Sequence, residues 1–180
     1  MSEPIPAEIW IGGKTRREQV PQLCKAIEDA GVALEWGDAY FAPETGEELE
    51  TACQDKDGVR LLCLCDDQAN YGEFKLLEEF LVRERITYRR KSDAKYEFDA
   101  EVVEHRPQVG QVRYPSDSSG QPFVPLATMM QIAATIDEAA NTAQGQTALE
   151  LLRRLRNVQQ LLHEALPVVV PPLEPFEIVG

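Results

Sequence analysis

A run of apolar residues that ends in two carboxylates is the feature that most constrains the fold of this chain. Residues 59–67 read Val-Arg-Leu-Leu-Cys-Leu-Cys-Asp-Asp. Strands buried on both faces read as nearly continuous apolar runs, and ligands in α/β sheets gather beyond the carboxyl ends of such strands. We therefore expect a central strand over 59–65, with Asp66 and Asp67 where a site would lie.

Helix starts and further strands alternate around this segment. The pattern Ser/Thr/Asn-x-x-Glu, in which the cap residue and the glutamate satisfy free backbone donors, begins at Thr15, Thr45, Asn70 and Thr147. Further strands are expected over 7–11, 32–36 and 86–91, and a fifth around 95–98. This β-α-β order predicts an α/β (α+β) fold, a ferredoxin-like sandwich of two split β-α-β units. A small doubly wound parallel sheet is the alternative.

The composition divides the chain into four parts. Residues 1–106 form the expected α/β domain, and 107–123 are rich in Pro, Gly and Ser, which is typical of a linker. Apolar residues at helical spacing over 124–166 predict an antiparallel helical hairpin. The apolar tail 167–180 holds too many prolines for a helix, so it either lies extended in a groove of its own fold or serves as a docking peptide.

The second expected helix has a wide apolar stripe. Leu152, Leu161 and Leu166 extend this stripe beyond what one partner helix covers. The hairpin therefore packs on the α/β domain, or it pairs with another copy or another protein. A homodimer formed through the C-terminal helices is one of these hypotheses.

The negative charge is concentrated in one segment. The formal net charge is −13, and the stretch 28–57 holds ten acidic residues against one base, Lys56. Such a patch attracts a basic protein surface and repels the phosphates of nucleic acids. A solvated face that keeps the protein dispersed is the simpler explanation. The candidate partner-binding residues are Glu35, Asp38, Glu44, Glu47, Glu48 and Glu50.

Three aspartates form the candidate metal site. Asp66 and Asp67 are joined by Asp38 if the strands 32–36 and 59–65 finish on the same side of the sheet. Oxygen ligands in that number suit Mg²⁺ or Mn²⁺, and a metal-assisted phosphoryl or hydrolytic reaction would follow. The competing explanation is structural, because Asp-Asp-Gln-Ala-Asn is also a turn that caps the next helix.

A glycine pair after the first strand is a candidate anion site. Gly12, Gly13 and Lys14 stand between a strand and a helix, where backbone amides can cradle an anion. The GxxxxGK[ST] spacing of a phosphate-binding loop is absent. A tight turn explains the same residues.

The cysteines and histidines offer little chemistry. Cys24, Cys63 and Cys65 fall in apolar segments, and with Cys53 they are expected to be reduced thiols, as in a cytoplasmic protein. Thiol chemistry at Cys63 and Cys65 lacks a nearby base. The two histidines are expected to be exposed. No stretch is long and apolar enough to span a bilayer, and the first residues lack the pattern of a secretory signal.

Two hypotheses of different classes follow. The first is a non-catalytic acidic interaction protein, of the regulatory, adaptor or inhibitor/immunity type, that binds a basic partner and needs no cofactor. The second is a small enzyme that uses Mg²⁺ or Mn²⁺ at Asp66 and Asp67 on a phosphorylated substrate. The residues favour the binding protein without deciding the question, and neither hypothesis involves direct contact with nucleic acid or a membrane.

Overall fold

The chain forms two compact units. The computed structural model describes residues 3–141, 148–165 and 168–180. The first unit holds the chain up to Gln121 together with Val170–Gly180, and the second is Pro122–Val169. The second unit is therefore an insertion between two segments of the first.

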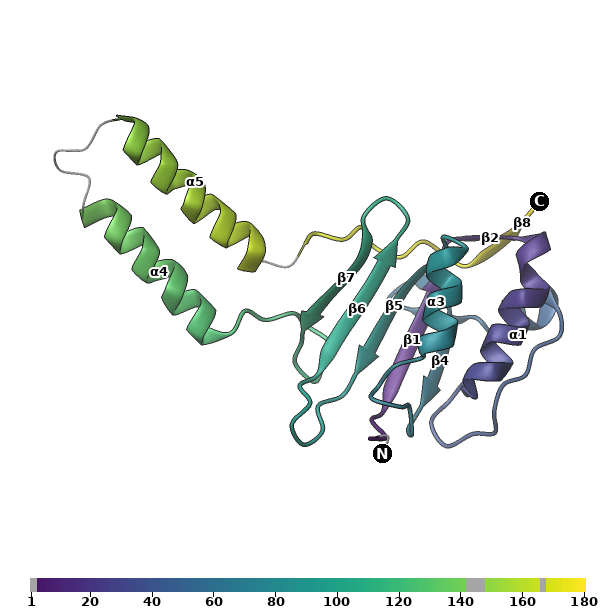
Figure 1. Cartoon of the computed structure of the whole chain (residues 1–180). Coiled ribbons are helices and arrows are strands. Elements are labelled where there is room, and N and C mark those ends of the chain that lie inside the picture. Colours follow the sequence, from purple (N-terminus) through teal and green to yellow (C-terminus); the bar gives the residue numbers. More distant parts are fainter. Residues whose placement is uncertain (1–2, 142–147, 166–167) are drawn as a thin grey trace. The chain divides into compact units, whose positions relative to one another are not determined.

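A six-stranded sheet forms the centre of the first unit (Figure 1). All neighbouring strands are antiparallel. A mixed α/β fold is confirmed, and the alternative of a doubly wound parallel sheet is wrong. In spatial order the strands are β3 (Gln54–Lys56), β4 (Val59–Asp66), β1 (Ala7–Gly12), β5 (Thr87–Ser92), β6 (Glu101–Arg106) and β7 (Gly110–Pro115).

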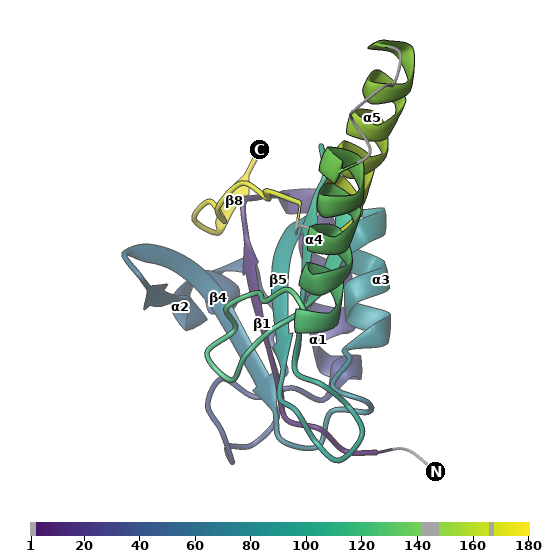
Figure 2. The same ribbon diagram turned by 90° about the vertical axis from the view of Figure 1, so that its left-hand side faces the viewer.

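Two helices cover one face of this sheet (Figures 1 and 2). They are α1 (Val20–Ala30), which follows a 3₁₀ turn over Arg17–Gln19, and α3 (Lys75–Arg83). Alternate residues of a strand point to the same face, so one set of strand side chains meets the apolar stripes of both helices. The resulting core includes Ile9, Ile11, Leu62, Leu64, Leu23, Ile27, Leu77 and Leu81.

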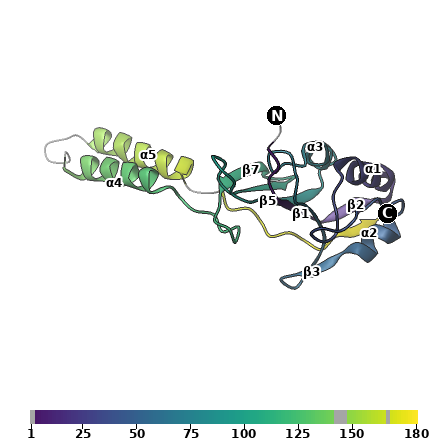
Figure 3. The ribbon, with the colours of Figure 1, turned by 90° about the horizontal axis from the view of Figure 1, so that it is seen from below.

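The described part of the C-terminal tail lies along its own fold. The Glu174 carbonyl accepts a hydrogen bond from the Gly13 amide, and the Phe176 amide donates to the Arg60 carbonyl at 2.9 Å. The Phe176 side chain is buried in the core. The last strand, β8 (Glu177–Val179), pairs in parallel with β2 (Lys14–Arg16) beside the short helix α2 (Gly46–Ala52) (Figure 3). Of the two expectations for this segment, the structure shows the intramolecular one.

Two expected strands are absent from the sheet. Residues 32–36 make only an isolated bridge, Ala33 with Cys65, and short β3 lies beside β4 instead. The reason is local, since the Phe41 amide donates to the Val32 carbonyl at 2.7 Å and folds the segment back on itself. Residues 95–98 form a tight bridge between Lys95 and Phe98 rather than a strand.

The stretch expected to be a linker contributes a strand to the sheet. β7 lies within residues 107–123 and pairs with β6, which the sequence did not single out. In β7 exposed and half-buried residues alternate, because β7 is an edge strand of the sheet. The linker expectation for 110–115 is therefore wrong.

Helix starts agree with the capping pattern at one position. At α2 the Thr45 hydroxyl accepts from the Glu48 amide, and the Glu48 carboxylate accepts from the Thr45 amide. α1 begins at Val20, since Thr15 is buried within β2, and α3 begins at Lys75. The position Thr147 lies outside the described residues.

The second unit consists of two contacting helices, α4 (Leu126–Asn141) and α5 (Ala148–Ala165). Ile132 is buried, and half-buried Val158, Leu161 and Leu162 mark one side of α5. Many large apolar side chains on both helices remain exposed: Leu126, Met129, Met130, Ile136, Leu149, Leu152 and Leu155. Among the described residues, no helix is both long enough and apolar enough to cross a membrane.

Candidate functional site

The carboxyl end of β4 opens into an acidic pocket of about 420 Å³, which we call the β4 pocket. The loop 31–40, which follows α1, forms its other wall. None of its described lining residues is Lys, Arg or His. The structure thus places Asp38 in the same pocket as Asp66 and Asp67. The lining carries two aromatic side chains and four carboxylates: Trp36, Tyr40, Glu35, Asp38, Asp66 and Asp67.

Backbone hydrogen bonds hold the loop in place. Gly31 ends α1 with φ 65°, a left-handed conformation that glycine adopts without strain. Ala33 and Cys65 exchange two backbone hydrogen bonds of 2.8 Å each. The base of the loop is thereby fixed to β4, while its tip leaves Trp36 53% exposed and Tyr40 76% exposed. Such exposed aromatic side chains are typical of binding surfaces.

The electrostatic environment of the pocket is visible at Cys65. Burial, followed by the carboxylates of Glu8, Asp66, Asp38 and Asp67, raises the pKa of this thiol to about 11. Surroundings that disfavour a thiolate favour a cation. Burial also raises the pKa of the Cys63 thiol, so neither cysteine of β4 is activated as a nucleophile.

The described residues give no support for a metal centre at the three aspartates. Among the described residues, no group of three or more His, Cys, Asp or Glu side chains is arranged to hold a metal ion. Asp66 has a local role, because its carboxylate accepts a hydrogen bond from the Gln68 amide at 2.9 Å. This is the turn that the sequence offered as the alternative to a site.

The remaining acidic candidates lie on and before α2, near the other end of β4. The Arg60 guanidinium, close to the start of β4, donates to the Glu50 carbonyl. Between Arg60 and Asp66 the extended chain spans about 20 Å. Glu50 therefore lies near the start of β4, whereas Asp66 and Asp67 stand at its end. Glu44, Glu47, Glu48 and Glu50 are exposed, and Glu48 is also engaged in the helix cap.

The glycine pair has a structural role. The Gly13 amide is occupied by the Glu174 carbonyl, and a Cβ at Gly12 would lie 2.3 Å from that same oxygen. These glycines thus allow the C-terminal tail to approach the end of β1. Lys14 is exposed in β2. The amide needed to cradle an anion is already in use, so the geometry does not support the expected anion site at Gly12, Gly13 and Lys14.

The sequence reasoning missed a buried polar network under α3. The Arg90 guanidinium contacts the carboxylates of Glu78 at 2.8 Å and Glu101 at 2.6 Å, and the Tyr88 hydroxyl donates to Glu78 at 3.0 Å. Burial, with the Glu78 charge, raises the pKa of Tyr88 well above its usual range. The signal in the sequence is the alternation of Tyr88, Arg90 and Ser92, which places all three on one face of β5.

One histidine differs from expectation. His105 is buried in β6, and its Nδ1 lies 3.0 Å from the Ile86 carbonyl oxygen, whereas His163 is exposed as expected.

No protein-family model, no curated protein and no solved structure matches this chain. The function is therefore inferred from the residues themselves.

Proposed function

We propose that this chain is a non-catalytic acidic interaction protein that binds a basic surface of another protein. Its β4 pocket would accept a Lys or Arg side chain of that partner. The observation that carries the proposal is the lining of this pocket, which combines four carboxylates with exposed Trp36 and Tyr40 and contains no basic residue among its described members. Regulatory, adaptor and inhibitor or immunity proteins bind partners in this way.

The physical basis is electrostatic attraction combined with an aromatic contact. A cation over the face of Trp or Tyr gains about 0.5–2 kcal/mol, depending on how far it is desolvated. The net charge of −13 is carried almost entirely by the first unit, because the helical insertion 122–169 has four acidic and three basic residues. This field speeds the approach of a basic partner and repels nucleic acid.

The alternative of a metal-dependent enzyme has less support. A phosphorylated substrate would need a divalent ion at Asp38, Asp66 and Asp67, and the described residues form no such centre. The proposed binding function requires neither Mg²⁺ nor Mn²⁺.

The test is calorimetric titration of the full chain with an arginine-rich peptide at two salt concentrations. We expect Trp36→Ala with Asp38→Asn to weaken binding about tenfold or more. The matched control is Glu47→Gln with Glu50→Gln on α2. Equal losses in the two variants would show that diffuse charge, not the β4 pocket, binds the peptide. Affinity that does not change with salt would contradict steering by charge.

The fold itself supports a ferredoxin-like interpretation. The strand order β3-β4-β1-β5 is antiparallel, α1 lies between β1 and β3 in the chain, and α3 lies between β4 and β5. We interpret these elements as two split β-α-β units, extended by the β6–β7 hairpin. This fold carries many unrelated functions, so it does not choose among them.

We further propose that α4 and α5 form an antiparallel hairpin that pairs with a second copy of the chain. Arg154 of α5 donates to the Glu138 carbonyl near the end of α4 at 3.5 Å, as antiparallel helices would allow. The large apolar side chains exposed on both helices would be buried between two copies of the chain in a symmetric pair. The near-neutral insertion does not oppose this contact.

Light scattering coupled to size-exclusion chromatography tests the dimer. Leu152→Glu with Leu155→Glu should convert a dimer to a monomer, whereas Asn157→Glu with Gln160→Glu, away from the Leu152 and Leu155 stripe of the same helix, should not. A wild-type monomer at high concentration would refute the pairing.

The four cysteines are free thiols, which supports the proposal of a reducing, cytoplasmic environment.

A further inference from the structure

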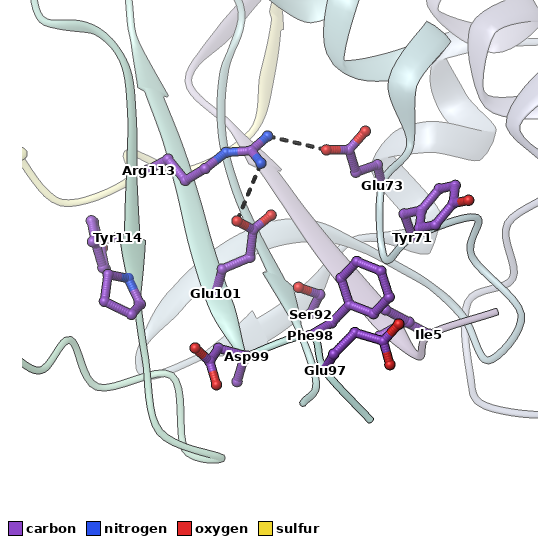
Figure 4. A pocket seen from close by; sticks show the side chains of 12 residues that line it. Ile5, Tyr71, Glu73, Ser92, Glu97, Phe98, Asp99, Glu101, Arg113 and Tyr114 are labelled. Atoms are coloured by element: carbon purple, nitrogen blue, oxygen red, sulfur yellow. Dashed lines mark hydrogen bonds and ion pairs between the residues drawn. The ribbon is translucent and has the colours of Figure 1, made fainter. Parts of the chain in front are cut away.

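A second pocket, which we call the Ser92 pocket, lies on the helix-covered side of the sheet near β7 (Figure 4). It measures about 600 Å³, a volume typical of small-molecule sites. Strands β5, β6 and β7 provide one wall, and the turn before α3 provides the other. It shares no lining residue with the β4 pocket.

The charges of this pocket divide into a paired and an unpaired group. Arg113 bridges Glu73 at 3.1 Å and Glu101 at 3.3 Å, along one margin of the pocket in Figure 4. Glu97 and Asp99 lie along the opposite margin. Neither makes an ion pair within the part of the chain that the structure describes. The unpaired charge of the pocket is therefore negative.

The side chain of Ser92 gives an independent indication of a ligand. Ser92 is only 4% exposed and lines the pocket, yet its hydroxyl makes no hydrogen bond to any described residue. Opposite it stands Gly72, where a Cβ would come within 2.6 Å of the Ser92 Cβ. This hydroxyl is not one of the fully enclosed polar atoms, so it is open to the pocket, where a bound molecule can supply the hydrogen bond.

Two aromatic side chains, Tyr71 and Phe98, also line the pocket. The rings of Tyr71 and Phe98 lie 5.7 Å apart at 60°. Tyr71 has a φ of 55°, which a residue with a side chain adopts only under strain, and its amide donates to the Glu3 carbonyl. Backbone strain of this kind occurs at ligand clamps.

We propose that the Ser92 pocket binds a small organic cation, an alkyl guanidinium or ammonium group. The cationic group lies against the Tyr71 and Phe98 rings and beside Glu97 and Asp99. One of its N–H groups donates to the Ser92 hydroxyl. Guanidinium and ammonium groups supply the donors and the positive charge that this combination requires. Such a group is present in a free amine or in the arginine side chain of a peptide.

Calorimetric titration of the full chain tests this proposal with two probes, agmatine and the blocked peptide acetyl-Gly-Arg-Gly-amide. Saturable binding of agmatine alone identifies a free cation as the ligand, and binding of both probes identifies an arginine side chain as well. No saturable binding of either probe overturns the proposal.

Variants locate the binding. Glu97→Gln with Asp99→Asn should weaken binding about tenfold, and Ser92→Ala should weaken it severalfold while the protein remains folded. Glu174→Gln with Glu177→Gln removes the same charge from exposed positions of the C-terminal tail and should leave binding unchanged. Equal effects of the two double variants overturn the proposal. Trp36 does not line the Ser92 pocket, so the effect of Trp36→Ala on peptide binding separates failure of the proposed function from failure of this inference.

Discussion

The Nε atom of Arg90 lies 2.8 Å from a carboxylate oxygen of Glu78, and the arginine side chain has no solvent exposure. The same guanidinium donates to the Gly72 carbonyl at 2.5 Å and to Glu101 at 2.6 Å. One buried cation thus joins α3, the turn before it and strand β6. Removing one partner of a buried ion pair leaves the other charged and unpaired, which is costly.

We therefore expect Arg90→Met to lower the free energy of unfolding by about 3–5 kcal/mol. Urea titration followed by circular dichroism measures this loss. The double variant Arg90→Met with Glu78→Gln should be less destabilised than the sum of the single variants, because it leaves one unpaired charge fewer. Additive losses would show that the two side chains do not interact.

The C-terminal tail should contribute to the stability of the sheet. Phe176→Ala removes a buried ring from the core and should cost about 3–5 kcal/mol in urea titration. Val169→Ala is the matched control, because Val169 is 91% exposed and should change stability by less than about 0.5 kcal/mol. A small effect of Phe176→Ala would mean that the tail detaches at little cost.

The N-terminal cap of α2 should contribute measurably to the free energy of unfolding. Thr45→Ala removes the acceptor of the Glu48 amide and should lower the free energy of unfolding by about 1 kcal/mol. Thr51→Ala, within the same helix, should be neutral or slightly stabilising, since alanine has the higher helix propensity. Thermal unfolding of the two variants side by side distinguishes the cap from propensity.

Stability should fall in alkaline solution because of the buried thiols. The pKa of Cys65 rises from 9.0 to about 11 in the folded protein, so the unfolded chain loses its proton first. Its contribution to stability is thus present below pH 9 and is lost as the pH rises toward 11. The stability difference between wild type and Cys65→Ala should shrink over this interval. A constant difference would show equal thiol pKa values in both states.

The sequence predicted the parts of the fold that depend on local pattern. The apolar run at 59–65 lies in internal strand β4, and the Thr45 cap starts α2. The pattern failed where tertiary contacts decide. Val32 and Ala33 resemble a strand, but one bridge to Cys65 replaces a ladder. The sequence pattern did not reveal β7, because this edge strand has few apolar residues.

The candidate sites show the same limit. Asp66 and Asp67 stood out because they end a buried strand, and Asp38 lies with them in the β4 pocket. The Ser92 pocket was not foreseen, because Tyr71, Ser92 and Arg113 come from distant segments that only the folded chain brings together. Spacing along a sequence carries no information about such convergence.

The place of Phe176 in the core has a consequence for the biosynthesis of this protein. Domains usually fold as they emerge during translation, N-terminal parts first. Here the core of the first unit stays incomplete while the whole helical insertion is being synthesised, because Phe176 and β8 come after it. The core of the first unit is therefore completed only after residues 122–176 have been synthesised and have left the ribosome.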